Sequence, residues 1–151
     1  MTDTDKRTHP LQAGEMSTGI LLLAMAGLCQ VLIAASNIPA ARLLDYRGQM
    51  QRVSPIVRDI FYVQNLYIEL VLVAQALVCW LFPGDLLGGS ALGRFSSGYL
   101  AAFWGLRLVI QFLHYDRDAR RAYPLVDAGM IVFQVYLTAV FLAAFSGVWK
   151  A

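Results

Sequence analysis

The stretch FWGLRLVIQFLHYD, residues 103–116, decides the fold. It resembles the second half of a membrane-spanning helix, yet it carries Arg107, Gln111 and His114. Together with Trp104, these side chains recur at spacings of three and four and therefore share one face of a helix. An arginine near the middle of a bilayer costs about 2.5–3.5 kcal/mol even on the most lenient insertion scale. We therefore expect the rest of the chain to supply polar partners for this face.

The composition is that of a membrane protein. The chain has 151 residues, of which 58% are hydrophobic and 15% charged, and its mean hydropathy is +0.57. The apolar residues gather in four blocks, each long enough to cross a bilayer. We predict an all-α fold, a four-helix transmembrane bundle that forms one integral membrane domain over residues 1–151. The net charge of +2 and the lack of a basic face argue against a nucleic-acid partner.

Prolines mark most ends of the predicted spans, which cover about residues 17–36, 56–82, 95–115 and 124–149. Met1–Glu15 is polar and predicts a short, poorly ordered tail. The first span is expected to end at Pro39, since the residue before a proline avoids the helical region. Ser54 as N-cap and Pro55 at the first helical position start the second span. Pro124 opens the fourth.

Orientation follows from the arginines, because cytoplasmic loops are enriched in positive charge. The loops 40–58 and 116–123 together hold Arg42, Arg47, Arg52, Arg58, Arg117, Arg120 and Arg121. The opposite side holds Lys6, Arg7, Arg94 and Lys150. We therefore predict a multi-pass protein with these two loops in the cytoplasm and both termini outside.

A polar stripe on the second predicted span is expected to face the arginine of the third. Arg58, Tyr62, Asn65 and Glu69 follow steps of four and three. Glu69 lies ten residues past Asp59, and Arg107 nine before Asp116. At ~1.5 Å per residue these depths are roughly 15 and 13 Å from the same side. Opposite charges at matching depth predict an ion pair, which either serves function or only fixes helix register.

The polar groups gather in the half of the membrane next to the arginine-rich loops. This predicts a bundle whose polar interior opens toward the cytoplasm. The candidate pocket residues are Arg107, Glu69, Asn65, Gln111, His114, Tyr62, Arg58 and Gln134. Its position near the membrane interface favours a hydrogen-bonded boundary residue over a ligand-binding role for His114. No catalytic set, metal site or cofactor motif is indicated, and Cys29 and Cys79 read as small core residues.

Three segments resemble small bacterial four-span membrane proteins without an assigned function. They are residues 60–68 (IFYVQNLYI), 89–94 (GSALGR) and 103–112 (FWGLRLVIQF). The resemblance covers the middle of the chain and the third span. It implies a bacterial inner-membrane protein and carries no activity with it.

The plan of the chain is also similar to the membrane-associated eicosanoid and glutathione metabolism family. Arg58, Asn65 and Glu69 match the family's Arg/Asn/Glu set on the second span, and Arg107 and Tyr115 would follow on the third. Here three residues separate Asn65 from Glu69, a wider spacing than in that family. The similarity implies a homo-oligomer, a trimer, that binds glutathione between subunits.

Three functions stay open. The first is a small polytopic membrane protein whose cytoplasm-facing polar pocket binds an amphipathic or lipid-like molecule, as a carrier or accessory subunit. The second is a membrane-embedded transferase or isomerase of the glutathione type, acting on lipophilic substrates. The third is a structural subunit of a larger membrane complex. The expected partners are thus the lipid bilayer, a lipophilic small molecule, and either a second copy or another membrane protein.

Overall fold

The described part of the chain is entirely helical. The structure is a computed structural model that describes residues 5–43, 45–113 and 124–149, with the side chains of 14, 16–39 and 41 in the first range. Its helices are α1 (Asp5–Leu43), α2 (Tyr46–Met50), α3 (Pro55–Leu81), α4 (Pro83–Leu87), α5 (Ala91–Leu113) and α7 (Pro124–Ser146). Within those ranges there is no strand, so the all-α prediction is confirmed.

Three of the described helical segments are long and apolar enough to cross a membrane. They are Met16–Pro39 within α1, Pro55–Leu81 (α3) and Pro124–Ser146 (α7). The fourth long helix, α5, has 23 residues but is not among them. Its glycines and serines near the start, together with Arg107 and Gln111, lower its hydropathy.

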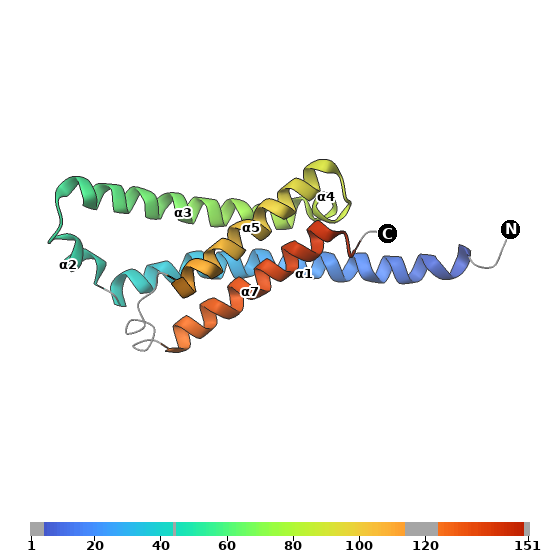
Figure 1. Ribbon diagram of the computed structural model, residues 1–151, viewed down its shortest axis with the longest axis horizontal. Helices are drawn as coiled ribbons and strands as arrows, with labels where there is room; N and C mark the ends of the chain where they lie inside the picture. Colours follow the sequence, from blue (N-terminus) through green and yellow to red (C-terminus); the bar gives the residue numbers. More distant parts are fainter. Residues whose placement is uncertain (1–4, 44, 114–123, 150–151) are drawn as a thin grey trace.

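The long helices associate in two pairs. α1 packs mainly against α3, and α5 packs along α7, while α4 lies at the turn between α3 and α5 (Figure 1). The start of α1 projects beyond the other helices (Figure 1). The sequence predicted that the second and third spans face each other closely. This expectation is wrong, because the main partner of α3 is α1.

The core lies where the two pairs meet. Trp104, Phe141, Leu137 and Leu23, from α5, α7 and α1, are completely buried. α1 approaches α3 closely at Gly27, where an added Cβ would lie 2.5 Å from Nε1 of Trp80. The indole N–H of Trp80 donates to the carbonyl oxygen of Ala24 at 3.0 Å. A glycine under a tryptophan ring thus sets the α1–α3 distance at this end.

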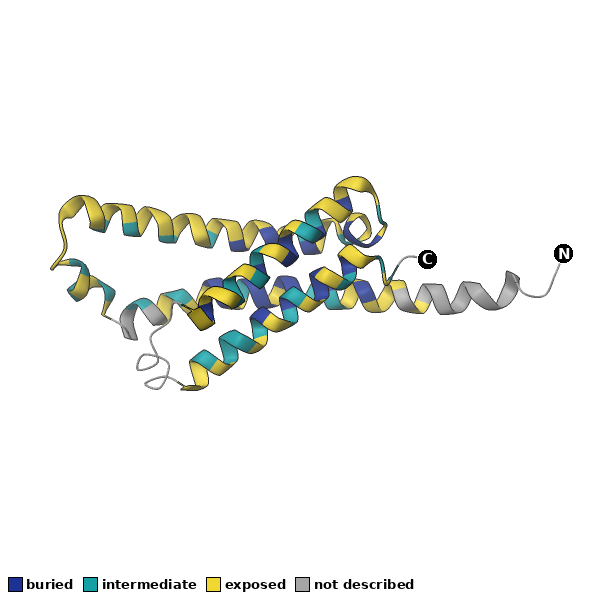
Figure 2. Cartoon of the chain, viewed as in Figure 1, coloured by how far each residue is buried: buried dark blue, intermediate teal, exposed yellow. Residues whose placement is uncertain are grey.

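Burial along α3 is uneven. Its buried residues, Leu72, Gln75, Ala76 and Cys79, all lie in the second half of the helix. The first half, from Pro55 to Val71, has no fully buried side chain. Figure 2 shows the same change along α3, from exposed near α2 to partly buried near α4. α3 is therefore held to the bundle at one end and leaves space beside α1 at the other.

Two predicted boundaries differ from the structure at α1. Residues 5–15 are helical rather than a poorly ordered tail. The helix also continues through Pro39 to Leu43, although Pro39 was expected to end it. A proline removes one helical hydrogen bond and bends a helix without always terminating it. The helices at the other three predicted spans start and stop within a few residues of the predicted bounds, although the predicted end of the third, at Tyr115, lies outside the described residues.

Candidate functional site

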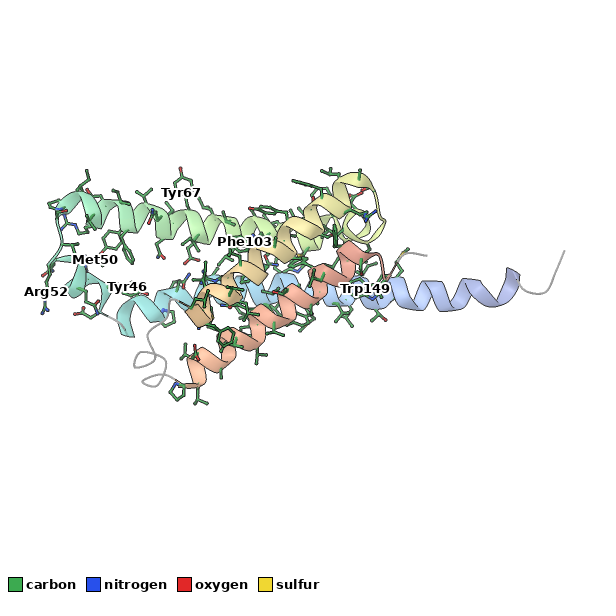
Figure 3. All side chains as sticks on the ribbon, viewed as in Figure 1. Tyr46, Met50, Arg52, Tyr67, Phe103 and Trp149 are labelled. Atoms are coloured by element: carbon green, nitrogen blue, oxygen red, sulfur yellow. The ribbon has the colours of Figure 1, made fainter. Side chains whose placement is uncertain are left out.

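A cavity lies in the space that the first half of α3 leaves beside α1. Its volume is about 1060 Å³. Figure 3 places Tyr46, Met50 and Arg52 at this end of the molecule, opposite Trp149. The cavity is lined by Asn37, Ile38 and Ala41 of α1, by Asp45, Tyr46, Arg47 and Gln51 in and around α2, and by Arg58, Phe61, Tyr62, Asn65, Leu66 and Glu69 of α3.

The turn between α1 and α3 folds back along one end of the cavity. We call this end the mouth; it is lined by Asp45, Tyr46, Arg47 and Gln51. Asp45 adopts a left-handed conformation, with φ 45° and ψ 50°, and its side chain accepts a hydrogen bond from the N–H of Gly48 at 3.2 Å. This cap starts the short helix α2. The ring of Tyr46 then meets the edge of Phe61 on α3, with centroids 5.4 Å apart. The aromatic contact holds α2 across from α3, so the mouth is framed by both helices.

The deep end of the cavity holds a polar contact between α1 and α3. Nδ2 of Asn37 donates to Oε1 of Glu69 at 2.6 Å, and the pair is partly buried. A hydrogen bond to a carboxylate is stronger than one between neutral groups. It therefore fixes the carboxylate of Glu69 in the cavity wall. Asn65 lies one turn closer to the mouth on the same helix face.

The cationic lining residues are near the mouth. Arg47 is on α2 and Arg58 is in the first turn of α3. Nε of Arg58 lies 3.9 Å from Oδ1 of Asp59, a contact between two partly exposed side chains that stabilises little. Glu69 is eleven residues farther along α3, roughly 16 Å at ~1.5 Å per residue. The mouth thus carries the guanidinium groups of Arg47 and Arg58 and the carboxylate of Asp45, which caps α2, while Glu69 is the ionisable lining residue at depth.

Four of the predicted pocket residues come together in this cavity. Arg58, Tyr62, Asn65 and Glu69 all line it, as their shared helix face implied. The predicted ion pair between Glu69 and Arg107 is wrong: the one salt bridge of the described residues joins Arg58 and Asp59. Matching depth did not make the two side chains neighbours, because α3 turns this face toward α1.

Arg107 lies in a separate groove on α5. The groove has a volume of about 170 Å³ and is lined by Phe103, Leu106, Arg107, Ile110 and Gln111. The guanidinium is half-buried, and its Nε makes no hydrogen bond. Within the described ranges no carboxylate pairs with it. Arg107 therefore has no counter-charge among the described residues.

Neither Gln111 nor Gln134 lines the cavity. Nε2 of Gln111 donates to Oδ1 of Asp127 at 2.7 Å, which joins the end of α5 to the start of α7. Gln134 is 0% exposed, and neither of its amide atoms makes a hydrogen bond. His114, the remaining candidate, is outside the described residues.

Sequence reasoning missed two interhelical polar contacts. Nε1 of Trp104 donates to Oε1 of Gln75 at 3.1 Å and links α5 to α3. Nε2 of Gln30 lies 3.7 Å from Sγ of Cys79 and links α1 to α3. The available signal was a glutamine inside an otherwise apolar stretch, Gln30 in α1 and Gln75 in α3. In membranes such side chains are commonly found between helices rather than facing lipid.

Several cavity residues were also missed. Asn37, Tyr46, Phe61 and Arg47 line the cavity but were not among the predicted pocket residues. The signal for Asn37 was its position near the end of the first span, at the level of the stripe on the second. The aromatic residues carried no such signal, since their contact depends on how the loop folds back. Across the described residues, no three His, Cys, Asp or Glu side chains are grouped to hold a metal ion.

Comparison with known proteins gives no relative. No family model, no curated protein and no solved structure matches the chain.

Proposed function

We propose that the chain is a multi-pass membrane protein whose cavity between α1, α2 and α3 binds an amphipathic or lipid-like molecule. The cavity carries this proposal. Its volume of about 1060 Å³ lies at the upper end of the range for small-molecule sites. It combines polar side chains at depth with apolar walls, and it is the place where α3 stands away from α1.

The proposed topology is a four-span bundle in a bacterial inner membrane. α5 supplies the third span, because it packs along α7, which is one of the three apolar helices. The segment 40–58, which contains Arg47, Arg52 and Arg58, lies in the cytoplasm, and both termini lie outside. The mouth of the cavity then faces the cytoplasm, and the chain acts as a carrier or accessory subunit.

A bulky side chain in the cavity wall tests the proposal. Ala41 lines the cavity, so Ala41→Trp is expected to fill part of it. Native mass spectrometry of the protein, gently extracted from its own membranes, should show a non-protein adduct that this variant loses. The control is Ala102→Trp, at an exposed position on α5 outside the cavity. An adduct that both variants retain, or a bare wild-type chain, would contradict the proposal.

A structural role in a larger complex is the second candidate, and Arg107 favours it. An arginine inside a span is almost always paired, yet Arg107 has no ion pair in the described ranges. A carboxylate on a partner membrane helix, seated in the groove of Phe103 and Ile110, would supply the missing charge. Affinity purification from native membranes should then recover a stoichiometric membrane partner that Arg107→Leu loses. Recovery of the same partner with wild type and with Arg107→Leu would argue against this candidate function.

A glutathione-dependent activity is the third. Arg58, Asn65 and Glu69, which match the resembling family, line one cavity. Membranes that contain the overexpressed protein should then conjugate glutathione to lipophilic electrophiles. An Asn65→Leu variant should lose that activity. Equal turnover in membranes with and without the protein would argue against an enzyme of this type.

A further inference from the structure

We propose that the deep end of the cavity recognises a positively charged amine, with Glu69 as its counter-ion. This inference rests on the proposed binding function and names the chemical class of the ligand: an amphipath with an ammonium head and an apolar tail.

The charges of the cavity wall support a cation at depth. Glu69 is the ionisable lining residue farthest along α3 from the mouth. The cationic lining residues, Arg47 and Arg58, belong to the mouth, roughly 16 Å away along α3 in the case of Arg58 at ~1.5 Å per residue. Arg107 lines a different groove and forms no ion pair with Glu69. The protein thus leaves the carboxylate without a cation in the described residues.

The carboxylate also has unused hydrogen-bonding capacity. Asn37 donates one hydrogen bond, to Oε1. An ionised carboxylate accepts about four hydrogen bonds through its two oxygens. A buried or half-buried charge in a membrane is costly unless it is paired. An ammonium group supplies both the opposite charge and the missing donors, whereas an anionic head would add a second negative charge.

The wall between the carboxylate and the mouth suits the same class of ligand. The rings of Phe61 and Tyr62 line this stretch, 5.8 Å apart and edge to face. Aromatic faces attract alkylammonium groups through their ring quadrupoles. Phe61 and Tyr62 therefore add to the attraction of Glu69 for a cation that passes or rests beside them.

Two apolar residues of the cavity lining suit the tail of such a ligand. Ile38 of α1 and Leu66 of α3 both line the cavity and remain 65% and 59% exposed. An apolar tail can lie against these two exposed side chains while the head reaches Glu69.

Charge-matched probes test the inference. Radiolabelled dodecyltrimethylammonium and dodecanoate share one tail length and differ in the sign of the head. Their binding is measured on the full-length protein in nanodiscs of uncharged lipid, with empty nanodiscs as background. Wild-type protein is expected to bind the ammonium probe at least about tenfold more tightly than dodecanoate, as expected for one charge-assisted contact.

Three variants separate the explanations. Glu69→Gln should weaken binding of the ammonium probe about tenfold and leave binding of dodecanoate unchanged or tighter. Glu69→Asp should keep most of the preference for the ammonium probe over dodecanoate. Asp59→Asn removes the same charge from the same helix, at a side chain that is 73% exposed and outside the cavity lining, and should change nothing. The Glu69→Asp result guards against a Glu69→Gln protein that is merely misfolded.

The outcomes are distinguishable from failure of the proposed function. If both probes bind, both are lost in Ala41→Trp, and Glu69→Gln has no effect, the cavity binds amphipaths and the cation inference is wrong. Tighter binding of dodecanoate than of the ammonium probe would overturn it in the same way. If Ala41→Trp binds both probes as well as wild type does, the cavity is not a binding site and both proposals fail.

Discussion

Replacement of Gly27 by alanine should loosen the contact between α1 and α3. The new Cβ would lie 2.5 Å from Nε1 and 2.8 Å from Cε2 of Trp80, closer than side-chain atoms pack. The indole has an exposed side, so it can swing outward, but it then gives up its 3.0 Å hydrogen bond to the carbonyl oxygen of Ala24. The substitution therefore displaces the indole ring of Trp80 and removes a tight contact between α1 and α3.

The expected change in the free energy of unfolding follows from three terms. Overpacking costs about 1–3 kcal/mol. An interhelical hydrogen bond in a membrane contributes about 0.6 kcal/mol. Alanine in place of glycine returns about 0.5–1 kcal/mol through helix propensity. The net loss in Gly27→Ala is thus about 1–3 kcal/mol.

Reversible unfolding in mixed micelles measures this difference. Gly129→Ala is the matched control, because Gly129 lies in α7 and an added Cβ there meets nothing within 4 Å. It should be as stable as wild type or slightly more stable. A Gly27→Ala protein that gains as much stability as the control would refute the close approach of Trp80, and with it the distance between α1 and α3.

Three further predictions concern polar side chains inside the helices. Gln134→Leu should raise the free energy of unfolding by about 1 kcal/mol in the same assay, since both amide atoms of Gln134 lack hydrogen bonds; a loss of similar size would show that the glutamine has a partner. Trp104→Phe should cost about 1–3 kcal/mol, because it leaves Oε1 of the buried Gln75 without its donor, and an unchanged midpoint with unchanged slope would contradict that contact. Arg107→Leu should lower the apparent insertion free energy of α5 by about 3 kcal/mol in a glycosylation-based insertion assay; an equal inserted fraction for both sequences would place Arg107 outside the membrane.

Helix positions in this chain follow from local chemistry. α3 starts at Pro55, directly after Ser54, and α7 starts at Pro124. Both starts agree with those predicted for the second and fourth spans. Ser54 has the extended conformation of a cap, although its side chain makes no capping bond. Proline fixes its own backbone and has no N–H to lose, so its preference for the first helical turn acts without tertiary contacts. The prediction that Pro39 ends the first helix was wrong, since α1 continues past this proline to Leu43.

Part of the α3 wall of the candidate site was also accessible to sequence reasoning. Arg58, Tyr62, Asn65 and Glu69 share one helix face by periodicity alone, and the structure brings all four to one cavity. Periodicity determines which residues of a helix point the same way. It does not say what they point toward, so the part of the site on α1 and α2 stayed hidden.

The tertiary structure alone decided which helices are neighbours. Glu69 and Arg107 have opposite charges at similar depth, yet Glu69 bonds to Asn37 of α1 and Arg107 lies in its own groove on α5. The position of a residue along a predicted span gives its depth in the membrane, while helix pairing depends on the fit between surfaces that are nearly all apolar. Lipid tails are as apolar as leucine, so pairing is decided by close contacts such as Gly27 under Trp80 and by a few polar bonds. Such contacts join residues far apart in the chain, and only the folded helices bring them together.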